Sequence, residues 1–291
     1  MRTREVLLLV AVFVWSLLAG TVDGAPIVSD GFENYTTGQI NNTNYGNGTE
    51  GWPSPWNGVN DPATKHFEAL TRSPASGAMH AQLFGQNSPD VSRHFGDYGK
   101  PGSGVAHELS ALSYQLEIKA ENKAYWGNDF NQYVRWQTTN AVHVEFRYQT
   151  GEIRCRGNTG LLDVVVGRWD GATYNGNPLY PNGLTLPDAQ LGYVTLREEI
   201  NLVNETYDLY YEDILLIANK GFRNLTGGKL NHVAFIQPKT SLAPTPPGPN
   251  DPSAGGVLID DILITPEPAT FGLFALIGLL GVRRGRTGGP G

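Results

Sequence analysis

Residues 193–217 read YVTLREEINLVNETYDLYYEDILLI, and their pattern decides the fold class. In the first ten residues apolar side chains alternate with polar ones, which is the period of a strand buried on one face. Val203-Asn204-Glu205 is a turn signal, so we interpret 206–217 as the hairpin partner of this strand. The side chains expected to point inward from the first strand are Val194, Leu196, Ile200 and Leu202.

The same alternation places Glu198 on the inward face. A carboxylate removed from water is costly unless an opposite charge accompanies it. We therefore expect a partner charge, such as an arginine, beside Glu198.

Strand patterns also occupy most of the remaining chain. Segment 107–120, HELSALSYQLEIKA, alternates strictly from 112 to 118, and segment 141–149, AVHVEFRYQ, alternates throughout. NHVAFIQ at 231–237 and the closing GVLIDDILI complete the set, and no helical period of useful length appears between the termini. The sequence predicts an all-β fold, a two-sheet antiparallel sandwich built from the body 26–265.

Composition agrees with this fold class and excludes some functions. The chain has 291 residues, of which 40% are hydrophobic and 17% charged, with 36 glycines and 19 prolines that favour short strands joined by turns. The net charge of −7 argues against nucleic acid as a partner, because phosphate binding needs a basic surface. Cys155 is the single cysteine, so no intramolecular disulfide can form, and we interpret it as a packing residue.

The N-terminal segment 1–25 is predicted to be a signal peptide. Arg2 and Arg4 form a positive region, and the apolar run 6–19 is too short for a comfortable membrane span. An uncleaved anchor is the alternative. The small residues after which cleavage is expected are Gly20, Gly24 and Ala25.

The C-terminal segment 266–291 has three parts in a fixed order. It begins Pro266-Glu267-Pro268, continues with 14 mostly apolar residues at 269–282, and ends in an arginine cluster. As a helix the apolar part would be roughly 21 Å long, which makes it a short transmembrane helix with the arginines on the cytoplasmic side. The cluster consists of Arg283, Arg284 and Arg286.

This order resembles the PEP-CTERM sorting signal of bacterial surface proteins. The resemblance implies recognition by an exosortase, cleavage near the Pro-Glu-Pro motif, and a host that makes exopolysaccharide. The tail TGGPG beyond the arginines is longer than the family's usual abrupt end. The protein is thus expected to be exported to the cell surface or beyond, through a transient single-pass membrane intermediate.

The proline-rich stretch 237–256 interrupts the body. It contains six prolines, so it is expected to be extended and outside any sheet. The strand GVLIDDILI that follows is too short to fold alone. We interpret 237–256 as a long surface loop that precedes a last strand returning to the same sheet.

The order of short motifs resembles the concanavalin A-like lectin and glucanase jelly roll. These motifs are SDGFENYTTGQI at 29–40, Gly51-Trp52, ASGAMHAQL at 75–83, and the strands already quoted. The resemblance implies that the first and last strands lie close together, with a structural calcium between Glu33 and Asp260 or Asp261. Galactose-binding-like carbohydrate modules, with a similar GFE and DD framing, are the alternative, although they are usually shorter.

Catalytic carboxylates are not evident. Glycosidases hold two carboxylates across the scissile bond, and the Glu-x-Asp-x-Glu pattern of the laminarinase-type enzymes of this superfamily is absent. The stripe His143-Glu145-Arg147 is the best-placed constellation, because alternate residues of a strand share one face; a solvated outer face is the alternative. The six histidines show no paired metal-ligand spacing.

Aromatic residues beside polar ones suggest sugar contacts. Trp126 is followed by Asn128 and Asp129, and Trp169 is followed by Asp170. Rings of this kind stack on sugar faces while amides and carboxylates bind hydroxyls. Core packing is the alternative for each tryptophan.

The expected function is that of an exported, exosortase-sorted cell-surface or extracellular-matrix protein that binds polysaccharide without turnover. The alternatives are a divergent glycoside hydrolase or polysaccharide lyase, and a passive structural component of the envelope. Whether the protein is an enzyme stays open. The expected partners are the exosortase, an exopolysaccharide and, before processing, the membrane.

Overall fold

The structure is a computed structural model that describes residues 27–35, 38–40, 51–57, 65–71, 75–85, 90–121, 129–157, 163–236 and 256–266. The predicted signal peptide 1–25, the transmembrane helix 269–282 and the proline-rich stretch up to residue 255 lie outside these ranges. All the regular secondary structure within them is β-strand. None of the described segments is a helix with the length and apolar character needed to cross a bilayer.

The first sheet, sheet A, has nine strands. Its strands run in the order β14-β13-β12-β7-β16-β4-β3-β2, with β1 also paired to β16. They are β1 (Val28–Asp30), β2 (Gly38–Gln39), β3 (Lys65–Leu70), β4 (His80–Gly85), β7 (Ala111–Glu121), β12 (Val194–Asn201), β13 (Thr206–Tyr211), β14 (Ile214–Gly221) and β16 (Gly256–Pro266).

The second sheet, sheet B, has seven strands in the order β11-β10-β9-β8-β15-β5-β6. Its pairs are antiparallel except β5–β6, which is parallel over two residues. The strands are β5 (Asp90–Gly99), β6 (His107–Glu108), β8 (Phe130–Trp136), β9 (Thr139–Phe146), β10 (Glu152–Cys155), β11 (Val164–Arg168) and β15 (Lys229–Ile236).

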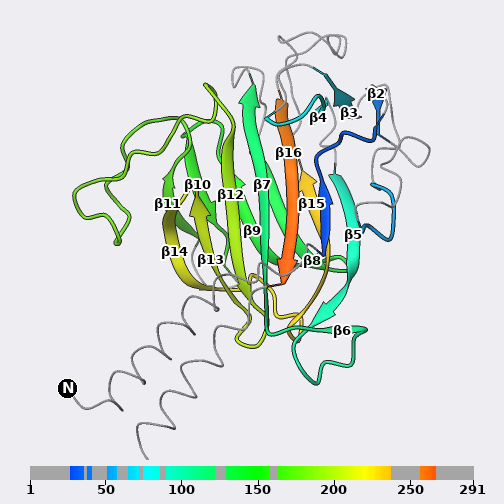
Figure 1. Ribbon diagram of the computed structural model, residues 1–291. Coiled ribbons are helices and arrows are strands. Elements are labelled where there is room, and N and C mark those ends of the chain that lie inside the picture. The colour runs from blue at the N-terminus through cyan, green and yellow to red at the C-terminus, as the bar shows by residue number, and fades with distance from the viewer. Residues whose placement is uncertain are drawn as a thin grey trace, which may run out of the picture.

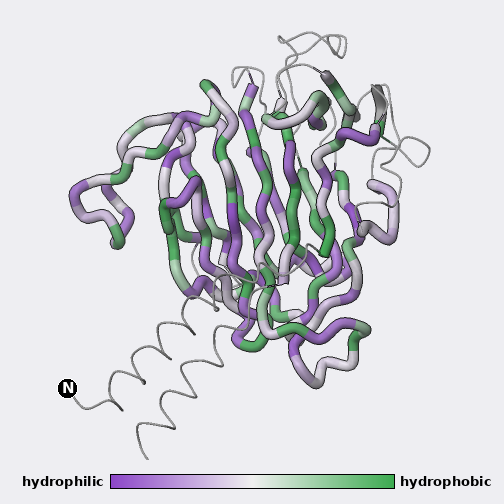
Figure 2. The backbone as a smooth tube through the Cα atoms, in the orientation of Figure 1, coloured by the Kyte–Doolittle hydropathy of each residue, from purple (hydrophilic) through white to green (hydrophobic). Residues whose placement is uncertain are grey.

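The two sheets stack face to face, with β7, β12 and β16 in front of β8, β9 and β15 in Figure 1. Along β7 the buried residues alternate with half-buried ones, and the alternating hydropathy of the strands is visible in Figure 2. Leu112, Leu116 and Ile118 thereby enter a single core that both sheets line. The predicted all-β, two-sheet sandwich is confirmed.

The stretch 193–217 forms the predicted hairpin, but its second half is two strands. β12 pairs with β13 from Asn201↔Thr206 to Leu196↔Tyr211. The chain then reverses at Glu212, whose φ is +53°, and Ile214 pairs back with Tyr211. The single partner strand predicted for 206–217 is therefore wrong, because the apolar residues on both sides of Glu212-Asp213 concealed a tight turn.

The last strand lies beside the first, as predicted. β1 pairs with β16 at Val28↔Ile264, and β16 is inserted between β7 and β4. The ladder with β7 is interrupted by a register shift next to Asp261, whose φ is +44°. A short polar side chain tolerates this left-handed conformation better than a β-branched one.

β16 extends one residue further than the predicted body. Pro266 is still in register with Leu112 of β7. The Pro-Glu-Pro motif thus begins inside the sheet, and its remaining residues lie outside the described ranges.

Candidate functional site

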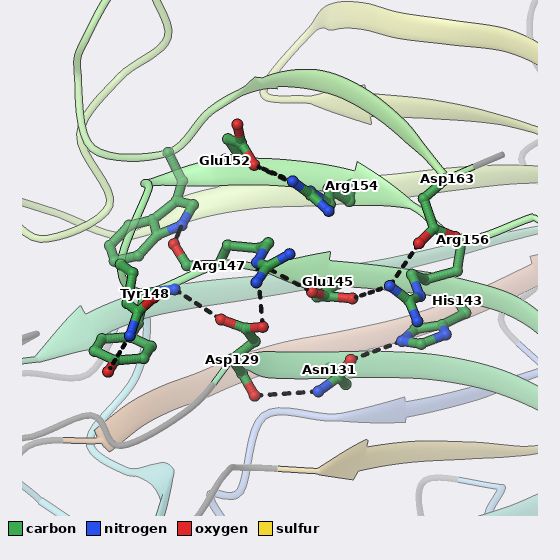
Figure 3. Close-up of polar contacts among 12 residues, drawn as sticks. Asp129, Asn131, His143, Glu145, Arg147, Tyr148, Glu152, Arg154, Arg156 and Asp163 are labelled. Carbon is green, nitrogen blue, oxygen red and sulfur yellow. Dashed lines mark hydrogen bonds and ion pairs between the residues drawn. The ribbon is translucent and has the colours of Figure 1, made fainter.

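The outer surface of sheet B carries a row of charged and amide side chains on β8, β9 and β10, which we call the polar face. Neighbouring strands pair Asn131 with Glu145, Tyr133 with His143, and Glu145 with Arg154. Residues paired across antiparallel strands point to the same side of the sheet. The predicted stripe His143-Glu145-Arg147 therefore forms the middle of a wider array (Figure 3).

Glu145 lies between two arginines in the centre of the polar face. Its Oε1 is 3.5 Å from Arg147 Nε, and its Oε2 is 3.2 Å from Arg156 Nη1. Arg147 Nε is also 3.3 Å from Asp129 Oδ2, and Arg156 Nη1 is 2.6 Å from Asp163 Oδ2. Figure 3 shows these five residues as one continuous network.

Glu145 is an acid with an altered proton affinity. Its side chain is only 7% exposed. Burial raises the pKa of Glu145, a hydrogen bond with Asp129 raises it further, and the Arg156 charge opposes both. Two carboxyl groups in such contact favour a state in which one of them holds a proton.

His143 is held as a neutral imidazole. Arg223 Nη1 lies 2.5 Å from its Nδ1, and its Nε2 lies 2.7 Å from Asn131 Oδ1. A guanidinium can only donate, so Nδ1 is the acceptor and the proton is on Nε2. Burial, followed by the charges of Arg223, Arg156 and Arg135, lowers the pKa of His143 to about 2.

Two ion pairs extend the array toward β11. Arg154 Nη2 is 2.7 Å from Glu152 Oε2, and Arg168 Nη2 is 2.7 Å from Asp170 Oδ2. Both arginines are about a quarter exposed. The polar face thus presents planar donors and acceptors whose orientations are fixed by one another, an arrangement suited to binding a ligand rich in hydroxyl or carboxylate groups.

The aromatic candidates have different outcomes. Trp169 is completely buried and its Nε1 donates to Arg147 O at 3.2 Å, so it cannot stack on a sugar. The core alternative applies, because the residue follows β11 directly and its ring enters the space between the sheets. Asp170 pairs with Arg168, and Asp129 belongs to the polar face. Trp126 and Asn128 lie outside the described residues.

The carboxylates predicted to hold calcium surround the segment 75–79. Glu33 Oε1 accepts the N–H groups of Ala78 and Met79 at 2.8 and 2.9 Å. Asp260 Oδ2 accepts those of residues 75 and 76, and Asp261 Oδ1 accepts the Ser76 hydroxyl at 3.0 Å.

These oxygens are therefore directed at hydrogen-bond donors. Burial, with the Asp261 charge as a further contribution, raises the pKa of Asp260 to about 7. Among the described residues no three acidic, histidine or cysteine side chains form a group that could hold a metal. The arrangement does not fit a calcium site, we derive no role for calcium, and calcium binding stays an untested prediction.

Sequence reasoning missed several members of the polar face. Arg154 and Arg156 alternate in GEIRCRG, and this period was a usable signal for a shared face. No sequence signal indicated Arg223, because it follows β14 of sheet A and reaches His143 of sheet B only in the folded chain.

Comparisons with known proteins find only distant similarities in structure. No protein family matches the chain, and neither does any curated protein. One similar solved structure is a sialidase, which has a TM-score of 0.45 and 8% sequence identity over 73% of this chain. Another is the cellulose-induced protein Cip1, with a TM-score of 0.44 and 14% identity; the match covers 81% of this chain and 96% of the Cip1 chain. A third is the binding domain of botulinum neurotoxin serotype D, with a TM-score of 0.46 and 11% identity; the match covers 90% of this chain and 53% of the neurotoxin chain. The match covers only 17% of the sialidase chain.

Proposed function

We propose that this protein is an exported cell-surface or extracellular-matrix protein whose polar face binds polysaccharide without cleaving it. The observation that carries the proposal is the ordered array on β8, β9 and β10. Its guanidinium and carboxylate groups are held in place by ion pairs, and the Asn131 amide by hydrogen bonds, before any ligand arrives.

A sugar chain suits such a surface because each hydroxyl both donates and accepts hydrogen bonds. Side chains already ordered by their neighbours lose little further conformational entropy when they bind. The distance from the first to the third of three adjacent strands is roughly 10 Å, so the array matches an extended ligand better than a small one.

The same geometry argues against glycoside hydrolysis at this face. Glycosidases separate their carboxyl groups by roughly 5–5.5 Å or 6.5–9.5 Å, depending on stereochemistry. Asp129 and Glu145 are instead both paired with Arg147 Nε, at 3.3 and 3.5 Å, so a guanidinium occupies the space between these two carboxyl groups. We therefore favour binding over the alternative of a divergent hydrolase or lyase.

We also propose export through the signal peptide 1–25 and exosortase sorting through 266–291. The end of β16 at Pro266 supports this, because a cut just after this residue leaves every described strand intact. An attached or released body would keep its complete sandwich.

The binding proposal is tested with full-length protein and immobilised polysaccharides of different composition. Arg154→Gln should weaken retention several-fold, whereas Arg197→Gln should not. The second variant is a matched control, because Arg197 pairs with Glu199 on the outer surface of sheet A and is equally exposed, 25% against 24%. Equal retention by both variants and the unaltered protein contradicts the proposal. Shortening of the bound polysaccharide contradicts the non-catalytic part.

The sorting proposal is tested by deleting 267–291, which leaves β16 complete. The truncated protein should appear in the medium, while the full-length chain should pass through a membrane fraction and lose its C-terminus. Identical fractionation of both chains, with no C-terminal processing, would refute the proposal.

A further inference from the structure

We propose that the part of the polar face around His143 is an anion-binding subsite formed by Arg223 and Arg135, and that the bound polysaccharide is therefore acidic. This inference rests on the proposed function and names its substrate class. The subsite would bind a carboxylate or sulfate group carried by the sugar chain.

Three arginines from different parts of the chain approach His143. Arg223 contacts the Nδ1 atom of His143. The Cζ atom of Arg135 on β8 lies 4.5 Å from the centroid of the Tyr133 ring, and that centroid is 4.2 Å from the centroid of the His143 ring. Arg156 follows β10, and its charge also acts on the imidazole. The neutral imidazole carries no negative charge, and it therefore does not balance any of this positive charge.

The counter-ions of these arginines are unequal. Arg156 has two carboxylate partners, Glu145 and Asp163. Arg135 has one distant partner, Asp90, at 3.4 Å. For Arg223 no carboxylate partner occurs among the residues that the structure describes, and within them its guanidinium forms one side-chain hydrogen bond, with the His143 Nδ1 atom.

Arg223 is nevertheless held firmly in place. Its backbone N–H donates to Ala141 O at 2.7 Å, and the neighbouring Asn224 Nδ2 donates to Asn140 O at 2.9 Å. These bonds attach the segment after β14 to β9 in the opposite sheet. On the other side, Asn140 Oδ1 accepts from Arg135 Nε at 2.6 Å and orients that guanidinium.

A half-buried cation without a counter-ion is unfavourable, and an incoming anion removes that penalty. A guanidinium also matches the planar geometry of a carboxylate and forms charge-assisted hydrogen bonds with it. Asp129 lies beyond Glu145 on the side away from His143, and these two carboxyl groups would repel a second anion. The surface thus favours an acidic sugar at the His143 end.

The test measures binding of full-length protein to a polyuronate, a sulfated glucan and a neutral glucan of similar length. We expect tighter binding to one or both acidic polymers, weakening as salt increases. Arg223→Gln should reduce that affinity about tenfold or more, the loss expected for a charge-assisted hydrogen bond. Arg223→Lys should retain part of the affinity, and neutral-glucan binding should change little.

Arg197→Gln is the matched control, since Arg197 is paired with Glu199 on the outer surface of sheet A, away from the polar face. Melting temperatures check that each variant is folded. If Arg223→Gln does not fold, the proposal is judged on the affinity of Arg223→Lys for the acidic polymers and on the salt dependence of binding by the unaltered protein. Preference for neutral glucan, or unchanged acidic-polymer binding by Arg223→Gln, overturns the subsite while leaving the proposed function intact. Absence of binding to any polysaccharide overturns both.

Discussion

Asp30 of β1 and Arg93 of β5 form an ion pair that joins the two sheets through the core. Asp30 Oδ2 and Arg93 Nη1 are 2.5 Å apart, and neither side chain is more than 1% exposed. Tyr35 Oη and Trp56 Nε1 also donate to Asp30, and Arg93 Nε donates to Ser54 O. Burial raises the pKa of Asp30, while the Arg93 charge and these hydrogen bonds oppose that change.

Removing the charge of Asp30 should therefore be costly. Asp30→Asn leaves the Arg93 guanidinium buried without its counter-ion, and we expect the free energy of unfolding to fall by about 3–5 kcal/mol. Urea denaturation measures this loss. Arg197→Gln removes a partly exposed surface ion pair and should cost no more than about 1 kcal/mol. A similar small loss for Asp30→Asn would show that the buried pair contributes little.

Glu198 gives a pH-dependent prediction. It is completely buried on β12, with Gln132 of β8 nearby, and the pKa of Glu198 is raised well above 4.5 by burial. The arginine partner expected from the sequence is absent among the described residues, where Glu198 forms no ion pair. The inward orientation was predicted correctly, but the partner was wrong, and the side chain is kept as a neutral acid instead.

Because the folded pKa of Glu198 exceeds the unfolded one, the folded state binds more protons above about pH 4.5. Its contribution to stability is complete below that pH and declines as pH rises. Glu198→Gln should remove this decline, so the variant gains stability relative to the unaltered protein between pH 4 and pH 8. The urea concentration at the unfolding midpoint, measured at pH 4 and at pH 8, gives the effect. Glu199→Gln is the control, because Glu199 is the half-buried neighbour of Glu198. An unchanged pH slope would refute this prediction.

Trp169 should behave as a core residue. Its ring is fully enclosed between the sheets, so Trp169→Ala should lower the free energy of unfolding by about 3–5 kcal/mol. Trp169→Phe should cost less and keep polysaccharide retention at the level of the unaltered protein. Thermal melting and retention measured on the same samples separate the two effects. Loss of retention in a folded Trp169→Phe variant would return this residue to the binding site.

Cys155 should be unreactive in the folded protein. Burial raises the pKa of the Cys155 thiol to about 12, so almost no thiolate exists at pH 8. A thiol reagent should modify it at pH 8 only as fast as the protein unfolds, and rapidly in denaturing urea. Stoichiometric modification within seconds under native conditions would contradict the buried position of β10.

Local pattern was enough to predict the strands with clear alternation and the face of their residues, but β5 and β8 were not predicted. The alternation around Tyr114 on β7 and Val144 on β9 predicted their orientation correctly because burial on one side of a sheet imposes a period of two. The same period also placed the stripe His143-Glu145-Arg147 on one face of its strand. The turn at Glu212 was missed because a positive φ at a charged residue carries no clear sequence signal.

Apart from the first and last strands, which were predicted to lie together, tertiary structure alone decided which distant segments meet. β16 lies between β7 and β4, and β8 pairs with β15, although long stretches of sequence separate the partners. The same long-range pairing buried Trp169, enclosed Asp30 with Arg93, and brought Arg223 from the end of β14 to His143 on β9. Strand period depends on neighbours in sequence, whereas burial, counter-ions and shared sites depend on neighbours in space, which only the folded chain defines.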